Sequence, residues 1–177
     1  MHIRPATIAD AAAIAAIYNV AVQTTTASFD VEPKSVDDRM QWLEHRDQRH
    51  PVIVAVDDDI VVGWGAFSRY SERPAYAATV EISIYVDADH QRLGVGRALS
   101  RALLDMAESL GIHTVLARIC TENTASIAMV RELGFSDAGT MHEVGRKFDR
   151  WLDVATWEYL VPGYAESRHG TDGGHSG

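Results

Sequence analysis

The fold is decided by the stretch Val80-Glu81-Ile82-Ser83-Ile84-Tyr85-Val86, followed after a short polar turn by Gln91-Arg92-Leu93-Gly94-Val95-Gly96. The first segment predicts a strand, because its side chains alternate between two faces. Downstream, apolar residues recur at helical spacing from Leu99 to Leu110 and predict a helix closed by Gly111. A strand, a glycine-rich turn and a helix N-terminus in this order can hold a pyrophosphate, since unpaired N–H groups and the helix dipole favour negative charge.

The glycine spacing excludes two common phosphate-binding motifs. A dinucleotide fingerprint needs a third glycine where Leu99 stands, and an acidic residue about 20 positions further on, where the sequence is a mostly apolar strand. A P-loop needs Gly-Lys-Ser/Thr, which is absent. What remains is Gln-Arg-x-Gly-x-Gly, in which Gly94 and Gly96 let the backbone approach a ligand. Arg92 and Arg97 can add charge-assisted hydrogen bonds.

This motif resembles the acetyl-CoA signature of the GNAT superfamily of N-acetyltransferases, and the resemblance covers the chain to about Leu160. It is strongest to the phosphinothricin and methionine sulfoximine N-acetyltransferases. The stretches that carry it are Ile17-Tyr18-Asn19, residues 24–29, Glu32-Pro33, Arg73, Tyr76, residues 79–81, 90–96, 122–127, 133–135, 144–148 and 151–153. The resemblance implies acetyl-CoA as acetyl donor, a small amino-acid-like amine as acceptor, and a homodimer.

The order of the expected elements agrees with this family. Strands are expected near residues 3–5, 52–56, 60–68, 79–86, 114–119, 137–144 and 151–160, and helices near 8–18, 36–45, 99–110 and 123–133. Thr7 and Ser35 are the candidate N-caps of the first two helices. The resemblance implies an α/β (α+β) fold with a mixed, twisted sheet of about seven strands flanked by four helices. In that fold the fourth and fifth strands splay apart to admit the cofactor. We expect one domain over residues 1–161 and a flexible tail over 162–177, where glycine, serine and histidine dominate.

The composition of the chain limits which binding partners and which cellular compartment are expected. A net charge of −9 and a pI near 5.3 argue against nucleic acid or an anionic membrane surface. The single cysteine, Cys120, allows no internal disulfide, and the sequence has neither a signal pattern nor a long apolar run. We therefore expect a cytoplasmic protein that does not span a membrane. The eight histidines form no metal-ligand spacing, so no metal is expected.

Glu81 is the candidate general base. The attacking amine must be neutral, whereas the α-amino group of an amino acid is mostly protonated at pH 7. A carboxylate can take that proton directly or through a water molecule. A carboxylate within an apolar strand is costly unless it is paired or used, so the alternative is a solvated or salt-bridged glutamate on the face of the sheet.

Other site residues follow from the resemblance. Backbone N–H groups of Ile84, Tyr85 and Val86 would polarise the thioester carbonyl. Residues Gln91, Arg92, Leu93, Gly94, Val95, Gly96 and Arg97 would hold the pyrophosphate, and Asn123 and Ser126 would add cofactor contacts. Phe29, Arg73, Tyr76, Lys147 and Phe148 would contact the acceptor. Asn123 is also a natural helix N-cap, and Arg73 and Tyr76 are equally compatible with a surface loop.

Several departures and alternatives stay open. Ser71 stands where some relatives carry lysine, which weakens the expectation for phosphinothricin itself. Val130 stands where many family members have a tyrosine acid, so no general acid is visible. The acceptor could instead be a peptide N-terminus, a lysine or a polyamine. A non-catalytic acetyl-CoA-binding module would have the same fold.

Overall fold

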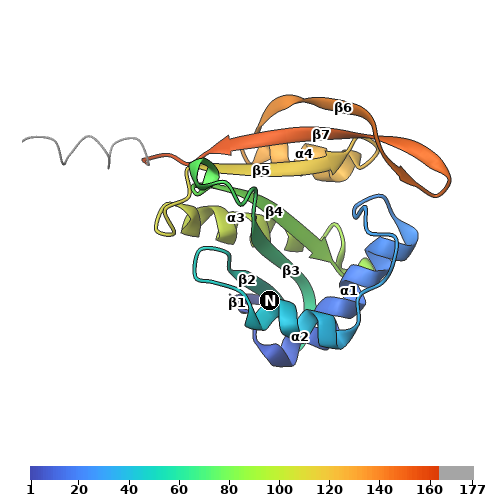
Figure 1. Ribbon diagram of the computed structural model, residues 1–177. Coiled ribbons are helices and arrows are strands. Elements are labelled where there is room, and N and C mark those ends of the chain that lie inside the picture. Colours follow the sequence, from blue (N-terminus) through green and yellow to red (C-terminus); the bar gives the residue numbers. More distant parts are fainter. Residues whose placement is uncertain (164–177) are drawn as a thin grey trace, which may run out of the picture.

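The computed structural model describes residues 1–163, which form one mixed sheet flanked by helices (Figure 1). The strands are β1 (His2–Pro5), β2 (Val52–Asp57), β3 (Ile60–Arg69), β4 (Thr79–Val86), β5 (Thr114–Cys120), β6 (Ser136–Lys147) and β7 (Arg150–Leu160). The helices are α1 (Ala11–Thr24), α2 (Val36–Glu44), α3 (Val95–Ala107) and α4 (Thr124–Glu132), with short 3-10 turns η1 (Ile8–Asp10), η2 (Pro74–Tyr76) and η3 (Ala88–His90). The predicted element order is confirmed. From residue 164 on, the predicted tail lies outside the described residues.

The predicted helix boundaries are mostly correct. Ser35 caps α2, because its hydroxyl accepts the Asp38 N–H at 3.0 Å. At Thr7 the Asp10 carboxylate accepts the Thr7 N–H at 2.7 Å, but this contact opens a single 3-10 turn, so α1 begins only at Ala11. The helix expected to run to Leu110 ends three residues earlier, and the chain leaves it through a bonded turn.

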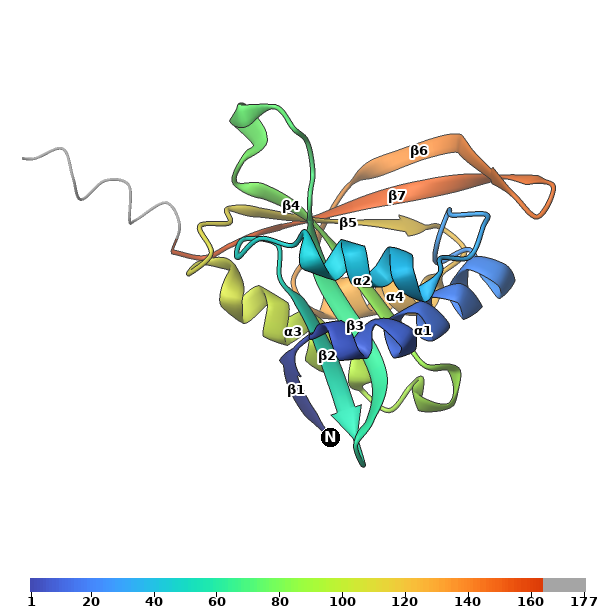
Figure 2. The same cartoon turned by 60° about the horizontal axis from the view of Figure 1, so that its bottom comes forward.

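The two faces of the sheet are covered by different helices. Figure 2 shows α1 and α2 crossing in front of the sheet, where buried Ile14, Val22 and Trp64 pack together. On the opposite face, Leu99 and Leu103 of α3 pack on the sheet in the larger apolar core. The alternation along β4 divides its side chains between these two cores, as the sequence predicts.

The sheet order is β1-β2-β3-β4-β5-β7-β6, in which only the β4–β5 pair is parallel. That pair is short, since its register ends at Glu81 opposite Leu116. Beyond this point β4 stays paired with β3, whereas β5 pairs with β7 along its whole length. Figure 1 shows the two halves of the sheet diverging here, as the family resemblance implies.

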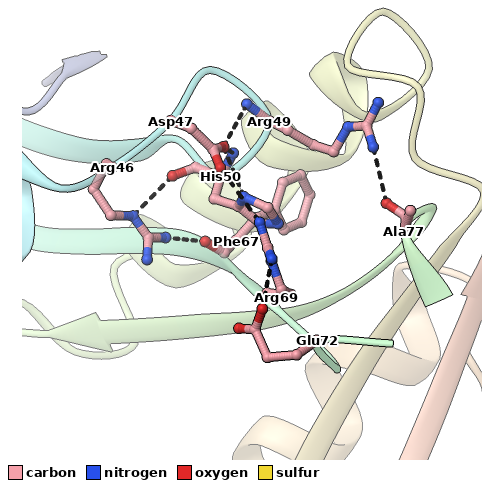
Figure 3. A network of polar contacts seen from close by, with 8 residues as sticks. All are labelled: Arg46, Asp47, Arg49, His50, Phe67, Arg69, Glu72 and Ala77. Atoms are coloured by element: carbon pink, nitrogen blue, oxygen red, sulfur yellow. Dashed lines mark hydrogen bonds and ion pairs between the residues drawn. The ribbon is translucent and has the colours of Figure 1, made fainter. Parts of the chain in front are cut away.

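A polar network fixes the start of the loop between β3 and β4 (Figure 3). The Arg46 guanidinium donates to the backbone carbonyls of His50, at 2.8 Å, and Phe67. Burial lowers the pKa of Arg46. Arg49 donates to the Ala77 carbonyl at 3.1 Å, across the far end of the same loop. The loop therefore leaves the sheet from two anchored ends.

Candidate active site

A cleft of about 840 Å³ occupies the wedge where β4 and β5 separate. Ile82 to Val86 form one wall, and the Gln91–Arg97 turn and α4 close it. Thr25, Thr26 and Ala27, from the loop after α1, reach the same cleft. The cleft therefore joins the predicted phosphate turn to the splayed strand.

The glycine-rich turn has the backbone that an anion needs. Gly94 has φ +86°, and no atom lies within 4 Å of where its Cβ would be, so glycine is required by conformation and not by space. Gly96 is different. A Cβ there would lie 3.4 Å from the Met129 Sδ and 3.6 Å from Val86, inside the cleft. Val95 is buried in the core, so only its backbone faces the turn. The N–H groups that open α3 thus face a space kept clear of side chains.

The arginines of the turn take up different positions. Arg97 lines the cleft but forms an ion pair with Glu132 of α4. Arg92 has φ +62°, and its exposed side chain also lines the cleft. Leu93 is 69% exposed and is absent from the cleft wall. The backbone of this turn, with Arg92 beside it, fits the pyrophosphate of acetyl-CoA.

The register of β4 aims two backbone donors into the wedge. The Asp87 N–H donates to the Val62 carbonyl at 2.9 Å, which identifies that pair as hydrogen-bonded. Hydrogen-bonded pairs alternate along an antiparallel ladder, so Tyr85 also directs its N–H toward β3. Ile84 and Val86 direct theirs to the other side, where β5 has left. Of the three predicted donors, these two face the cleft.

Asn123 lies at the opposite wall and caps α4. Its side-chain carbonyl accepts the Ser126 N–H at 3.1 Å, which confirms the N-cap interpretation. Both residues also line the cleft. The cap occupies the amide oxygen and leaves the amide N–H₂ group as the donor for a cofactor contact.

Glu81 lies at the point where the strands part and is paired. Arg118 of β5 donates to one carboxylate oxygen of Glu81 through Nε at 3.0 Å and through a terminal nitrogen at 2.7 Å. The Glu81 side chain is 20% exposed, and that of Arg118 is 52% exposed. Arg118 lines the cleft, whereas Glu81 is not part of the cleft wall. The salt-bridged arrangement is therefore present, and it brings the carboxylate to the edge of the cleft.

Residues 14–135 match the model of the Acetyltransferase (GNAT) family. The chain belongs to the GNAT family. It is therefore an acetyl-CoA-dependent N-acyltransferase, as the signature at Gln91–Gly96 predicts, and the expected fold is confirmed.

Two curated relatives and one solved structure document the similarity. The chain is 41% identical to the L-amino acid N-acyltransferase MnaT of Escherichia coli, over 87% of this chain and 90% of that protein. It is 40% identical to the L-methionine sulfoximine/L-methionine sulfone acetyltransferase of Salmonella typhimurium, over 93% and 97%. The phosphinothricin acetyltransferase of Sinorhizobium meliloti, solved in complex with acetyl-CoA, has a TM-score of 0.87 at 31% identity, covering 90% of this chain and 88% of that one.

In this GNAT chain, Lys147 holds a loop. It is 5% exposed, and its Nζ donates to the carbonyls of Thr25 at 2.9 Å and Ser28 at 2.6 Å. Burial lowers the pKa of Lys147, although the charge of Asp30 opposes the shift. The predicted acceptor contact thus stays a prediction. In the chain itself, the ammonium fastens the loop after α1 to the end of β6.

Phe29 and Phe148 lie around this anchor. The Phe29 ring lies against Gly145 of β6. The Lys147 ammonium lies over the Phe148 ring, with Nζ 5.1 Å from the ring centroid. Phe148 and Asp149 have φ of +51° and +59° and form the tight turn between β6 and β7. Neither aromatic side chain lines the cleft. Both side chains remain partly exposed.

Arg73 and Tyr76 lie on the loop between β3 and β4, outside the cleft wall. Tyr76 is 40% exposed and stacks edge-on against Tyr70 at 5.2 Å. This position agrees with the surface-loop interpretation. Their contact with an acceptor stays a prediction.

Sequence reasoning missed Arg118. The residue is a charge between Ala117 and Ile119 of an otherwise apolar strand, which is the same signal that identified Glu81. The pairing itself could not be predicted, because it depends on the parallel register of β4 and β5. Cys120 is buried, as expected for a small core residue.

Among residues 1–163, none of the helices has the length and apolar character that a bilayer crossing requires. No group of three or more possible metal ligands occurs in the same residues.

Proposed function

We propose that this enzyme transfers an acetyl group from acetyl-CoA to the amine of a small amino-acid-like acceptor, of the methionine sulfoximine or phosphinothricin type. The main observation that supports this function is the position of Glu81, which lies where β4 and β5 separate, beside the cleft that fits acetyl-CoA. The names of the relatives support the acceptor class. The proposed setting is the cytoplasm.

The backbone of the cleft would orient the acetyl donor. The N–H groups that open α3 would hold the pyrophosphate. The Ile84 and Val86 N–H groups would donate hydrogen bonds to the thioester carbonyl oxygen and stabilise the negative charge that develops on it. Both sets of donors are fixed by secondary structure, so they need no reorganisation during the reaction.

Glu81 would take the proton. The acceptor arrives as an ammonium ion and gives one proton to the Glu81 carboxylate. The neutral nitrogen forms a bond to the acetyl carbon as the carbon–sulfur bond breaks, and CoA leaves as a thiolate. The nitrogen now carries one proton more than the amide product, and this surplus proton can neutralise the thiolate. Arg118 would hold the carboxylate at the edge of the cleft.

A homodimer is part of the proposal. At the tip of the β6–β7 hairpin, Phe148 is 48% exposed and Trp151 is 60% exposed. A second subunit would cover this apolar surface. Phe148 and the partner's copy would then help enclose the acceptor. Light scattering at micromolar concentration should give a dimer; a monomer would remove the hairpin from the acceptor site.

The direct test is CoA-thiol release from acetyl-CoA with a panel of amines. The panel contains phosphinothricin, methionine sulfoximine, methionine sulfone, the common amino acids, polyamines and short peptides. We expect turnover with the first three or with free amino acids. Turnover only with peptides or polyamines would replace the acceptor class. Acetyl-CoA binding without turnover of any amine would favour a sensing module.

A further inference from the structure

A second cavity lies on the opposite side of β4 from α3. It has a volume of about 140 Å³ and lies between the two N-terminal helices and the sheet. Its walls include Arg39, Trp64, Ser68 and Ser83. At about 30 Å³ per molecule of liquid water, such a volume accommodates a carboxylate with its α-carbon. The cavity has no part in the acetyl-CoA cleft, but Ser83 and Tyr85 line both spaces.

Arg39 in this cavity is buried, and its guanidinium forms no ion pair with the residues up to 163 that the structure describes. It is 8% exposed and lies over the rings of Tyr18 at 4.3 Å and Trp42 at 5.2 Å. Its Nε finds no acceptor among the described residues. The charge of Arg39 contributes to lowering the pKa of two carboxyl groups, those of Asp30 and Asp38. Both have other partners: Asp30 accepts from Tyr18 at 2.8 Å and pairs with Lys34 at 3.2 Å, and Asp38 accepts the Ser35 N–H at 2.9 Å. A buried guanidinium held only by aromatic faces is costly unless something pairs with it.

Trp64 adds a second buried donor. Its Nε1 likewise lacks an acceptor among residues 1–163. Guanidinium and indole N–H groups donate only, and the hydroxyls of Ser68 and Ser83 can donate as well. The residues that line the cavity include no Asp or Glu. A cavity rich in donors and free of carboxylates is suited to an anion.

We propose that this cavity binds the α-carboxylate of the acceptor amino acid, with Arg39 as its main partner. The inference rests on the proposed function and names the recognition element for its acceptor. Ser83 follows Glu81 by two residues on the same face of β4, so the cavity begins about 7 Å along the strand from the proposed base. A carboxylate held there directs the amine, one carbon away, toward the Glu81 end of the cleft.

The test compares a free amino acid with its uncharged α-amide in wild type and Arg39→Met. Methionine fills much of the arginine stem volume and keeps the packing on Tyr18 and Trp42. Wild type should prefer the acid, and Arg39→Met should reduce the acid-to-amide ratio of kcat/KM about 10- to 100-fold, as expected for a lost hydrogen bond to a charged group. Arg39→Lys should restore part of the ratio.

Arg46→Met is the matched control. Arg46 also lies over Trp42, at 4.8 Å, but it is outside the cavity wall. Its loss can lower stability but should leave the acid-to-amide ratio unchanged. If Arg39→Met folds poorly, Trp64→Phe removes the second donor and keeps an aromatic ring, and it should lower the same ratio severalfold.

A binding readout complements the kinetics. Trp42 and Trp64 line the cavity, so added amino acid should change their fluorescence in the presence of CoA. Half-saturation should rise about 10- to 100-fold in Arg39→Met. An unchanged acid-to-amide ratio, with both substrates equally slower, would assign Arg39 to packing and overturn the inference alone. Absence of turnover with every free amino acid in wild type would instead overturn the proposed function, and the inference with it.

Discussion

The two faces of β4 differ in chemistry although they share one backbone. Ile82, Ile84 and Val86 face α3 and belong to the larger apolar core. Glu81 and Ser83 lie on the face that carries the N-terminal helices, next to the Arg39 cavity. The first face has apolar side chains, so the polar groups near it are the Ile84 and Val86 N–H groups, which point sideways into the gap left by β5. The second face presents polar side chains. A strand with a period of two can therefore serve two substrates, one on each side.

The largest loss of activity is expected from a substitution on the polar face of β4. Glu81→Gln removes the proton acceptor while keeping the shape and a hydrogen-bonding oxygen for Arg118. We expect kcat at neutral pH to fall about 100-fold or more, in the range typical of a lost general base, with the KM for acetyl-CoA nearly unchanged. Steady-state kinetics across pH would measure both quantities.

The control for this variant is Glu122→Gln. Glu122 pairs with Arg150 in a similar exposed ion pair on the other half of the sheet, and it should leave kcat unchanged. A Glu81→Gln enzyme with the same pH–rate profile as wild type would remove Glu81 from the mechanism.

In the cleft beside the apolar face, Gly96→Val should weaken the binding of acetyl-CoA and leave the binding of the acceptor unchanged. A Cβ at this position already lies 3.4 Å from Met129 Sδ, so the two methyl groups of valine must enter the cleft. Overpacking of this kind costs about 1–3 kcal/mol, so the KM for acetyl-CoA should rise roughly tenfold or more. Isothermal titration with CoA would measure the binding loss directly.

Gly96→Ala should show a much smaller change, because its single methyl group makes only ordinary contacts. The KM for the acceptor should stay within about twofold in both variants. A larger effect on the acceptor than on acetyl-CoA would mean that the two faces are not separate.

A smaller effect is expected for Lys147→Met, which releases the loop after α1 from β6. Two carbonyls, those of Thr25 and Ser28, lose their donor. The free energy of unfolding should fall by about 1–3 kcal/mol, and the KM for the acceptor should rise severalfold because Thr25 lines the cleft. Urea denaturation and kinetics would measure these changes.

The pH dependence of this variant has a definite sign. Burial lowers the pKa of Lys147 in the folded protein below the ordinary lysine value of 10.5. Between the two pKa values the unfolded chain binds more protons, so the stability contributed by Lys147 rises with pH. The stability of wild type relative to Lys147→Met should therefore increase as the pH rises toward 10. A decrease would contradict the buried ammonium.

Local sequence predicted most of the fold. The alternation in Val80–Val86, the Ser35 cap and the glycine-rich turn each depend on neighbours in the chain, and each is present. The sequence predicts the end of α3 three residues too late, because apolar spacing continues through a hydrogen-bonded turn to Leu110 although the regular helix ends at Ala107.

Contacts between distant segments could not be predicted. Arg118 meets Glu81 only through the register of two strands, and Lys147 reaches a loop 119 residues away in sequence. The Arg39 cavity is formed by the helices α1 and α2 and the strands β3 and β4 together. The sequence shows which side chains can ionise or donate hydrogen bonds, but the tertiary structure determines which groups they meet.

The central claim is that both substrates are bound at once, on the two faces of β4, and react directly. Initial velocities measured at several fixed acetyl-CoA concentrations, against a varied amino acid, test it most directly. Direct transfer in a ternary complex predicts intersecting double-reciprocal lines. Parallel lines would indicate an acetyl-enzyme intermediate and would contradict direct transfer.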